Sequence, residues 1–232
     1  MINTNKIACI GAGYWGKNLV RNFNEIGVLS WICDADPHRR AQLAMEYPDA
    51  RLTDAVDQVL TDPNVTGIAI ATPAVTHADL VQRALLAGKD VFVEKPLSLS
   101  VEEAQRLVAV ASDRRRILMV GHLLWYHPAV LKLKQLVDEG ELGRIRYIYS
   151  NRLNLGKIRR EENILWSFAP HDISVILGVN RSPLRGVASH HGCDISRPTY
   201  HCVHLWTESG STTFGAPSAW IAGIEIGTRP RL

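Results

Sequence analysis

The feature that most constrains the fold of this chain is a glycine-rich turn at residues 11–16, with the sequence Gly-Ala-Gly-Tyr-Trp-Gly. An apolar run at residues 7–10 precedes the turn and predicts a buried strand. An amphipathic stretch at residues 14–26 follows it and predicts a helix. The first glycine of such a turn allows a tight bend, the second lets a pyrophosphate approach the backbone, and the third lets helix and strand pack closely.

The turn therefore predicts a dinucleotide site, with a βαβ unit that binds no nucleotide as the alternative. The N-terminus of the predicted helix supports the site because its N–H groups and dipole attract an anion. The expected cofactor contacts in the turn are Gly11, Gly13, Tyr14, Trp15 and Gly16.

The acidic residue that follows the second predicted strand, residues 28–33, indicates which dinucleotide binds. This residue, Asp34, lies about 20 residues after the turn, where an acid binds the adenosine ribose. A carboxylate there repels a 2′-phosphate, so we expect NAD rather than NADP. Arg39 and Arg40 lie nearby and could weaken that repulsion, or they belong to the solvated face of the next helix, which Asp36 would cap.

Strand-like and helix-like segments alternate through the first half of the chain. Gly88 is expected to end one helix in a left-handed conformation, and Ser100 with Glu103 predicts a capping box for the next. This alternation predicts an α/β fold, a doubly wound parallel Rossmann sheet over residues 1–121. We expect residues 122–232 to form a smaller α+β domain with an open, mostly antiparallel sheet.

Composition narrows the function classes. The 232 residues are 46% hydrophobic and 21% charged, as in a globular protein, and the net charge of +3 is too small to argue for nucleic acid. No apolar run approaches membrane-spanning length, and the N-terminus has no signal-peptide pattern. The four cysteines form no C-x-x-C pair. Together these features predict reduced thiols and a cytoplasmic protein without nucleic-acid or membrane partners.

Three predicted strand ends carry polar or rigid residues, at residues 71–73 (Ala-Thr-Pro), 94–96 (Glu-Lys-Pro) and 121–122 (Gly-His). Ligands of doubly wound sheets bind beyond these carboxyl ends. The prolines have a simpler explanation, because proline commonly ends a strand. Lys95 is less easily explained that way, since an unused charge in the crevice would be costly.

The glycine turn, residues 71–77 (ATPAVTH), the EKP triplet at 94–96 and the Gly-His pair at 121–122 together resemble the Gfo/Idh/MocA oxidoreductase family. The resemblance covers residues 1 to about 125 of this chain. It implies that Lys95 is catalytic beside the nicotinamide and that the Lys–Pro bond is often cis. It also implies further cofactor contacts at Thr72, Pro73, His77, Glu94 and Lys95.

Residues 151–159 and 166–174 are similar to a branch of that family, and the resemblance extends to about residue 178. This branch oxidises UDP-N-acetylglucosamine, or its uronic acid, at the 3-hydroxyl for surface polysaccharides. The resemblance implies that His171 is the catalytic base, a role suited to histidine because its ordinary pKa is about 6.5. Ser167 stands where many family members have an aspartate, which favours the sugar-nucleotide branch over inositol dehydrogenases. The alternative is that His171 caps or packs a helix that starts after Pro170.

A diphosphate substrate needs cations, and residues 144–160 are rich in arginine and lysine. The alternative for any one of them is a solvated strand face. The predicted substrate contacts are His122, Arg152, Asn154, Lys157 and His171.

A competing zinc site is possible at two pairs of residues with period-two spacing, which are His191 with Cys193 and Cys202 with His204. On two antiparallel strands, the residues of each pair would lie on one face of their strand. The alternative is two ordinary strands with incidental histidine and cysteine, which the sequence favours because the spacing matches no common zinc pattern. We therefore expect no metal.

The last stretch, residues 211–232, shows no clear period and no family resemblance. We interpret it as the product of a frameshift that truncates the second domain. Such a domain should expose a strand edge and persist only by self-association, by pairing with the tail, or by weakly ordered folding. Reduced stability and low turnover are then expected.

The sequence thus predicts an NAD-dependent oxidation of a UDP-N-acetylhexosamine to a 3-keto sugar nucleotide. Alternatives are a dehydrogenase of a free sugar or cyclitol and a non-catalytic nucleotide-binding protein. The family resemblance also implies a homo-oligomer formed through the outer face of the C-terminal sheet.

Overall fold

The computed structural model divides into two compact units, Met1–Gly121 and His122–Leu232, which are described separately. The residues that the structure describes are 6–143, 145–153, 164–179, 184–192, 200–207, 210–216 and 221–228.

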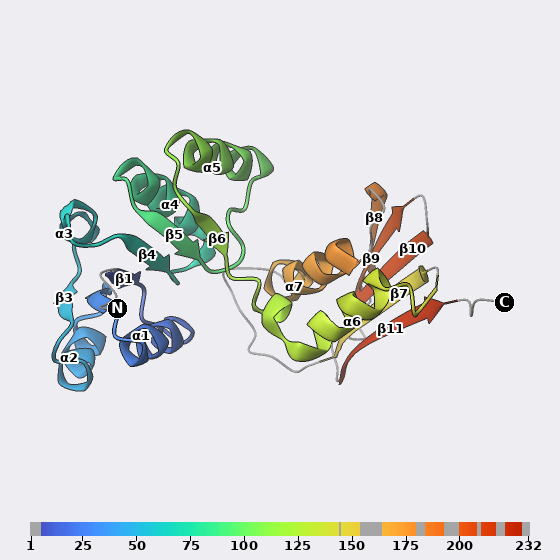
Figure 1. Ribbon diagram of the computed structural model, residues 1–232, viewed down its shortest axis with the longest axis horizontal. Helices are drawn as coiled ribbons and strands as arrows, with labels where there is room; N and C mark the ends of the chain where they lie inside the picture. The colour runs from blue at the N-terminus through green and yellow to red at the C-terminus, as the bar shows by residue number, and fades with distance from the viewer. Residues whose placement is uncertain are drawn as a thin grey trace. The chain divides into compact units, whose positions relative to one another are not determined.

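The first unit is built on a parallel sheet of six strands in the order β3-β2-β1-β4-β5-β6 (Figure 1). Its strands are β1 (Ile7–Ile10), β2 (Leu29–Cys33), β3 (Arg51–Thr53), β4 (Gly67–Ile70), β5 (Asp90–Val93) and β6 (Leu118–Val120). Its helices are α1 (Gly16–Glu25), α2 (Pro37–Glu46), α3 (Val56–Thr61), α4 (His77–Leu86) and α5 (Val101–Asp113), with a 3-10 turn η1 (Ala74–Thr76). The predicted doubly wound fold is confirmed, and the strand order reverses between β1 and β4, where such sheets bind ligands.

Alternate strand residues pack on opposite faces of this sheet. Cys9 of β1 and Ile32 of β2 pack with Val20 of α1 and Leu43 of α2 on one face. On the other face, β1, β4 and β5 pack against α3, α4 and α5 through Ala8, Ile10, Ile68, Ile70, Val91, Val93, Val59, Leu80, Val81, Leu85 and Leu107. A sheet covered by helices on both faces explains why its strands are short, continuous apolar runs in the sequence.

The predicted helix boundaries have the expected local chemistry. Asp36 caps α2, because its Oδ1 accepts hydrogen bonds from His38 N at 2.9 Å and Arg39 N at 3.3 Å. Gly88 follows α4 with a φ of +74°, the left-handed conformation expected of it. Half of the capping box is present, since Ser100 Oγ accepts from Glu103 N at 3.3 Å.

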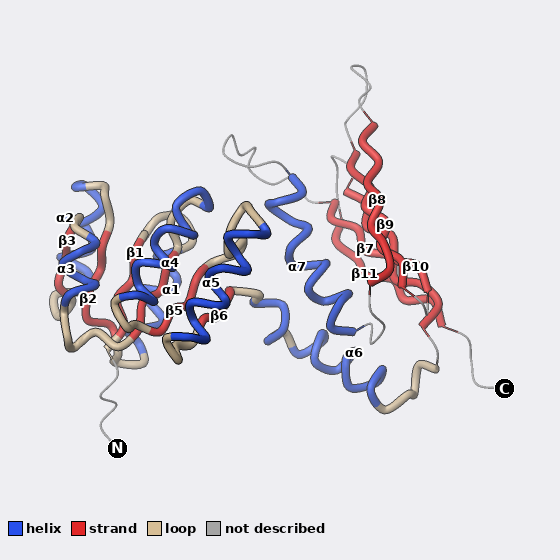
Figure 2. Tube along the Cα trace, turned by 90° about the horizontal axis from the view of Figure 1, so that it is seen from above, coloured by secondary structure: helices blue, strands red, loops and turns tan. Residues whose placement is uncertain are grey.

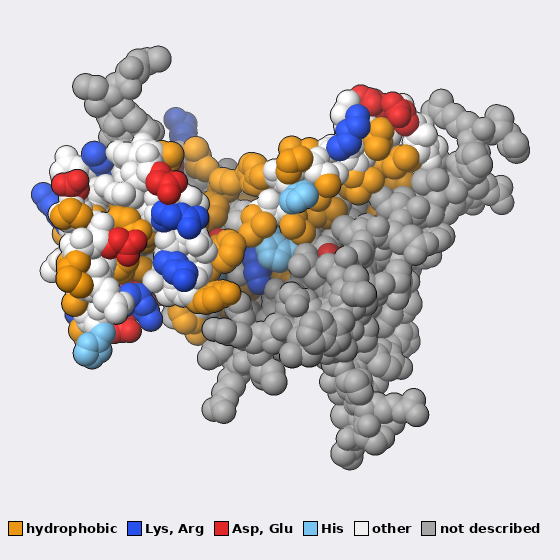
Figure 3. Space-filling view, turned by 90° about the horizontal axis from the view of Figure 1, so that it is seen from below, with side chains coloured by type: hydrophobic (Ala, Val, Ile, Leu, Met, Phe, Trp, Pro, Cys, Tyr) orange, Lys and Arg blue, Asp and Glu red, His pale blue; other side chains and the backbone are white. Residues whose placement is uncertain are grey.

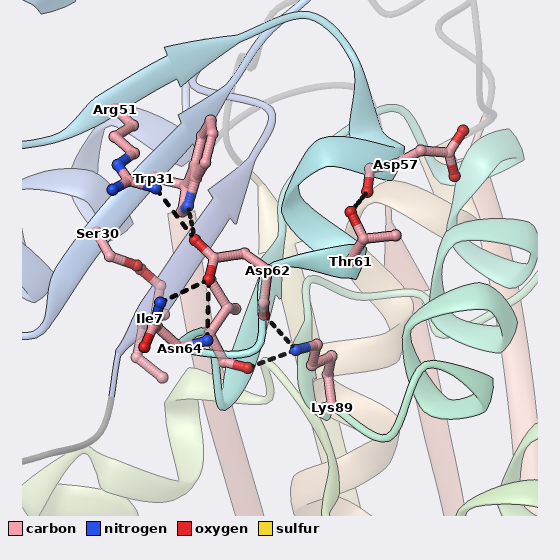
Figure 4. A network of polar contacts seen from close by, with 10 residues as sticks. Ile7, Ser30, Trp31, Arg51, Asp57, Thr61, Asp62, Asn64 and Lys89 are labelled. Atoms are coloured by element: carbon pink, nitrogen blue, oxygen red, sulfur yellow. Dashed lines mark hydrogen bonds and ion pairs between the residues drawn. The ribbon is translucent and has the colours of Figure 1, made fainter.

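A polar network ties the amino ends of the strands together (Figure 4). Lys89, only 6% exposed, donates from Nζ to the carbonyl oxygens of Asp62 and Val65, each at 2.7 Å. Trp31 Nε1 donates to Asp62 Oδ2 at 2.8 Å, and this hydrogen bond holds the pKa of the Asp62 carboxyl below its usual range. Burial lowers the pKa of Lys89. The network lies at the amino ends of the strands, whereas ligands of such sheets bind beyond the carboxyl ends. We therefore interpret the network as structural.

The second unit contains a five-stranded sheet in the order β11-β7-β10-β9-β8. Its strands are β7 (Ile145–Leu153), β8 (Leu184–Gly192), β9 (Tyr200–Thr207), β10 (Gly210–Ala216) and β11 (Ile221–Thr228), and its helices are α6 (Pro128–Asp138) and α7 (Ile164–Val179), with a 3-10 turn η2 (Leu123–Tyr126). The β7–β10 pair is parallel and the other three pairs are antiparallel, which confirms a mostly antiparallel sheet. Both helices lie on one side of the strands (Figure 2).

The tail is paired, although residues 211–232 show no clear period in the sequence. Strand β10 inserts between β7 and β9, and β11 pairs with the other edge of β7. Of the three ways in which the second domain was expected to persist, the structure shows pairing with the tail. Periodicity missed these strands because strand formation depends on cross-strand neighbours that lie far away in the sequence.

The strand register contradicts the arrangement of the competing zinc site. His191 lies opposite His201, while Cys202 lies opposite His190 and His204 lies opposite Ala188. Residues directly opposite share a face and neighbours along a strand alternate, so position 191 is on the face opposite to positions 202 and 204. Residue 193 lies outside the described residues. Incidental histidine and cysteine positions on two ordinary strands remain as the explanation.

Helix α7 begins six residues before Pro170, so His171 lies inside the helix rather than at its start. The capping alternative for His171 is therefore wrong. Proline lacks the N–H that an interior helix position normally donates, so the hydrogen-bond ladder of α7 has a gap directly before His171.

Apolar side chains gather over η2 and α6 on the face shown in Figure 3, and Leu123, Tyr126 and Leu131 are among the exposed ones.

Within the described part of the chain, no helix combines the length and the hydropathy that crossing a bilayer requires.

A tight contact in the second unit yields the first prediction. A methyl group at Gly178 of α7 would overlap the six-membered ring of Trp125 in η2. Alanine improves helix propensity by about 1 kcal/mol, whereas overpacking costs about 1–3 kcal/mol, so Gly178→Ala should lower the free energy of unfolding. Urea unfolding followed by circular dichroism measures this. The loss should be smaller in a Trp125→Phe background, and an unchanged or raised stability of the single variant would contradict the packing.

Candidate active site

Two glycines of the turn after β1 are required by the packing of the protein itself. Gly11 has a φ of +86°, and a Cβ there would lie 2.8 Å from the carbonyl oxygen of Ala71. Gly16 opens α1 directly against the carbonyl group of Gly11, with no room for a side chain. These two positions bring the start of α1 against β1 and the end of β4, as the sequence predicts.

Gly13, the middle glycine, has a different reason to be glycine. No protein atom lies within 4 Å of the place where its Cβ would be. The protein therefore does not need a glycine here for its own packing, and the open space lies where the sequence predicts a pyrophosphate. The turn thus separates two glycines that shape the fold from one that leaves room for a ligand.

Asp34 is buried at the end of β2, with 6% of its surface exposed, and its carboxylate is held by the surrounding loops. Ala12 N donates to Oδ2 at 2.7 Å, while Asp36 N and Arg39 Nη1 donate to Oδ1 at 2.9 and 2.8 Å. Burial acts to raise the pKa of Asp34, but these hydrogen bonds outweigh it and hold the pKa below the usual range. A carboxylate offers about four acceptor positions, so a ribose hydroxyl meets a charged but largely occupied group.

Both nearby arginines point back to Asp34 rather than only to solvent. Arg39 pairs with its carboxylate and, at 3.4 Å, with Asp36 Oδ2. Arg40 Nη1 donates to the main-chain oxygen of Asp34 at 2.6 Å, and its Nη2 lies 3.1 Å from Asp54 Oδ2. Of these two arginines, Arg39 is therefore the one whose charge acts directly on the Asp34 carboxylate, which is predicted to bind the ribose.

The glycine turn is linked to the end of β5 by a side-chain hydrogen bond. Trp15 Nε1 donates to Glu94 Oε1 at 2.6 Å. The Glu94 carboxylate also lies over Gly121, where a Cβ would be 3.1 Å from each oxygen. Burial raises the pKa of Glu94, and the hydrogen bond from Trp15 and the charge of Lys95 oppose this effect. Two predicted cofactor positions, Trp15 and Glu94, thus come together at one strand end. The remaining predicted position of the turn, Tyr14, is 70% exposed.

The loops after β4 and β5 are joined through a buried imidazole. His77, 1% exposed, places Nδ1 2.7 Å from the carbonyl oxygen of Pro96 and Nε2 2.9 Å from that of Thr72. The Lys95–Pro96 bond is cis, as the family resemblance implies. Pro73 begins the exposed end of the first loop. Since both ring nitrogens of His77 face protein atoms, its direct contact with the cofactor stays a prediction.

His171, the predicted base, lies in the middle of α7 and is partly buried. Its carbonyl oxygen accepts a hydrogen bond from Ser174 Oγ at 2.7 Å, which closes the helix turn after Pro170. The next residue, Asp172, is 2% exposed. No sequence pattern points to Asp172, because a lone acid beside a histidine carries no spacing signal.

The predicted substrate contacts are only partly described. His122 is the first residue of the second unit and its carbonyl oxygen accepts from Trp125 N at 3.1 Å, at the start of η2. Arg152 lies in β7, opposite Ala222 of β11. Asn154 and Lys157 lie outside the described residues. All of these roles stay predictions.

Comparison with known proteins agrees with this geometry. A family model described as an oxidoreductase family with an NAD-binding Rossmann fold matches residues 5–122. The structure of GenD2 from gentamicin A biosynthesis, in complex with NAD, superposes with a TM-score of 0.85 at 22% identity, covering 96% of this chain and 68% of that one. The cofactor of this fold is therefore NAD, as predicted.

Two relatives of known activity share more sequence. UDP-N-acetylglucosamine 3-dehydrogenase of Acidithiobacillus ferrooxidans is 31% identical over 169 residues, which are 72% of this chain and 52% of that protein. The NAD-dependent scyllo-inositol 2-dehydrogenase of Bacillus subtilis is 33% identical over 148 residues, 61% of this chain and 42% of that protein. The chain thus spans about half the length of these relatives. Both alignments are longer than the first unit and so extend into the second.

The contrast between the glycines of the turn yields the second prediction. Gly13→Ala should weaken NAD binding about tenfold or more, about 1.4 kcal/mol, because its methyl group enters the open space. The same variant should change the free energy of unfolding by no more than about 0.5 kcal/mol. Calorimetric titration with NAD and urea unfolding measure the two quantities.

Gly16→Ala is the matched control, and it should instead destabilise the first unit by about 2 kcal/mol or more through overlap with Gly11. If Gly13→Ala bound NAD as tightly as the unmutated chain, the pyrophosphate would have to lie elsewhere.

Proposed function

The chain belongs to the Gfo/Idh/MocA family of NAD-binding oxidoreductases, and on this premise we propose that it oxidises the 3-hydroxyl of a UDP-N-acetylhexosamine with NAD. The product is a 3-keto sugar nucleotide. The observation that carries the proposal is the 31% identity to a UDP-N-acetylglucosamine 3-dehydrogenase, which extends beyond the cofactor unit into the unit that contains His171.

Lys95 and His171 have separate roles in the proposed reaction. NAD held at the glycine turn and Asp34 would supply the hydride acceptor. Lys95 at the end of β5 donates a hydrogen bond to the alcohol oxygen, and its charge stabilises the developing alkoxide. His171 accepts the hydroxyl proton as general base. Trp15 and Glu94 hold the glycine turn to the strand end that carries Lys95.

A second candidate function is the oxidation of a free cyclitol. It is favoured by the 33% identity to scyllo-inositol 2-dehydrogenase. Against it stand Ser167, where many family members have an aspartate, and the basic residues of the segment 144–160, which suit a diphosphate. For that reason the nucleotide sugar is the first choice.

Formation of NADH with a panel of substrates tests the proposal. The panel contains UDP-N-acetylglucosamine, its uronic acid, UDP-N-acetylgalactosamine, scyllo-inositol and myo-inositol, each with NAD. We expect the highest kcat/KM with one of the nucleotide sugars. Turnover confined to the cyclitols would replace the first candidate function by the second.

Two further properties belong to the same proposal. We expect the protein to work in the cytoplasm, where NAD and nucleotide sugars are both available. We expect a homo-oligomer formed through the outer face of the β7–β11 sheet, which light scattering measures.

The catalytic assignment yields the third prediction. Lys95→Met and His171→Ala should each lower kcat about 100-fold or more, because each removes a group that acts on the reacting hydroxyl. The dissociation constant for NAD should stay within about threefold in His171→Ala, since His171 is not among the predicted cofactor contacts. Lys132→Met on α6 and the exposed His38→Ala are matched controls that should leave kcat unchanged. Near-normal turnover of His171→Ala would make His171 a structural residue.

The fourth prediction concerns cofactor choice. We expect NAD to bind at least tenfold tighter than NADP, about 1.4 kcal/mol, because the ionised Asp34 repels a 2′-phosphate. Asp34→Ala should reduce this ratio, whereas Arg39→Ala should increase it by removing the charge that offsets the carboxylate. Arg40→Ala is the matched control, since Arg40 contacts the main-chain oxygen of Asp34 and the carboxylate of Asp54 rather than the carboxylate of Asp34. Equal affinities of the unmutated protein for both cofactors would overturn the ribose assignment.

A further inference from the structure

One buried side chain connects the two loops that follow β4 and β5, the neighbouring strands at the cofactor side of the sheet. His77, the first residue of α4, lies between the carbonyl oxygen of Thr72 in one loop and that of Pro96 in the other, at 2.9 and 2.7 Å. With 1% of its surface exposed, His77 exchanges neither contact for water. The position of Lys95, next to Pro96, therefore depends on this contact.

The chemistry of the two partners limits the state of the ring. A carbonyl oxygen accepts hydrogen bonds and cannot donate them. A neutral imidazole has a single N–H, so it would satisfy one carbonyl and turn a lone pair toward the other. Only a ring with a proton on each nitrogen donates to both, and a buried acceptor that loses its donor costs stability.

The nearby charges are compatible with such a ring. The Glu94 carboxylate, at the end of β5, interacts electrostatically with both His77 and Lys95. On α4 itself, Asp79 is exposed and pairs with Arg83 at 3.6 Å. The loop after β4 contributes the neutral Thr72. The negative Glu94 on the β5 side of the imidazole favours a positive ring. The positive Lys95 beside it, the burial of the ring and its place at the N-terminus of α4 oppose one, so the proton on each nitrogen is inferred from the two carbonyl partners.

We propose that His77 carries a proton on each ring nitrogen and acts as a positioning residue, which holds the Lys95 loop and the Thr72 loop together. Its kinetic consequence rests on the proposed role of Lys95 as a catalytic residue. The state of the ring and its effect on NAD binding do not depend on the identity of the substrate.

Two substitutions separate the two contacts. The amide nitrogen of asparagine can take the place of Nδ1, and that of glutamine can take the place of Nε2. His77→Asn should therefore keep the contact with Pro96 and lose that with Thr72, and His77→Gln should do the reverse. We expect His77→Gln to lower kcat about tenfold with NAD affinity kept, and His77→Asn to weaken NAD binding about fivefold with kcat kept.

Val59→Ala is the control for a general loss of stability. Val59 is fully buried and belongs to the core on that face of the sheet, and its helix, α3, carries neither loop. Its substitution should lower the unfolding temperature and change neither kcat nor NAD affinity. If both His77 variants lost stability in the same way and kept kcat and NAD affinity, the positioning role would be refuted.

The ring itself can be observed in the unmutated chain, which keeps the test valid if a variant fails to fold. Long-range proton–nitrogen NMR spectra of nitrogen-labelled histidine report the protonation of each ring nitrogen. The His77 signals can be assigned by their loss from the spectrum of His77→Gln. We expect a proton on each ring nitrogen, and a nitrogen without a proton would overturn the proposal. If no panel substrate were oxidised, the NMR spectra and the NAD affinities would still decide it.

Discussion

The contact on which the rest of the first unit depends is the approach of α1 to β1 at Gly16 and Gly11. A side chain at Gly16 would overlap the Gly11 carbonyl, and one at Gly11 would press on the carbonyl of Ala71 at the end of β4. The helix can therefore begin directly beside the two central strands, at the point where the strand order reverses. Gly13 is left facing open space beside the N-terminus of a helix, which is the geometry that binds a pyrophosphate.

Charges around that space are arranged by main-chain groups as much as by side chains. The Asp34 carboxylate receives hydrogen bonds from two backbone N–H groups and one guanidinium, and this combination outweighs the cost of burial. Glu94 is in the opposite situation, because the effect of its burial outweighs the hydrogen bonds from Trp15 and from the Lys95 backbone N–H. Asp34 and Glu94 both follow the carboxyl ends of strands in one sheet, and their surroundings shift their pKa values in opposite directions.

The second unit follows another rule. Its sheet takes two of its five strands from residues 210–228, and one of them, β10, runs parallel to β7 in the middle of the sheet. On one side of the sheet, α7 packs against the Trp125 ring of η2, which leaves no room for a side chain at Gly178. This sheet is therefore assembled mainly by contacts between distant segments, in contrast to the β1–α1–β2 segment.

The features of this protein that could be predicted from the sequence are those with local causes. The glycine turn, the cap of Asp36 on α2 and the left-handed Gly88 depend on residues within a few positions of each other, so they could be predicted without tertiary structure. The alternation of strands and helices in the first unit could also be predicted from the sequence. Both faces of its sheet are buried, so its strands are continuous apolar runs. The identity of the family followed from the spacing of motifs along the chain.

The contacts between residues of different elements, and the strand registers, could be seen only in the tertiary structure. It placed Arg39 rather than Arg40 on the Asp34 carboxylate, and it placed His77 between two carbonyl oxygens that belong to different loops. It also set the register that separates His191 from Cys202, and it made strands of a tail that shows no period. The physical reason is the same in each case: hydrogen-bond partners and strand registers are selected by segments far apart in the chain, and no local pattern encodes that selection.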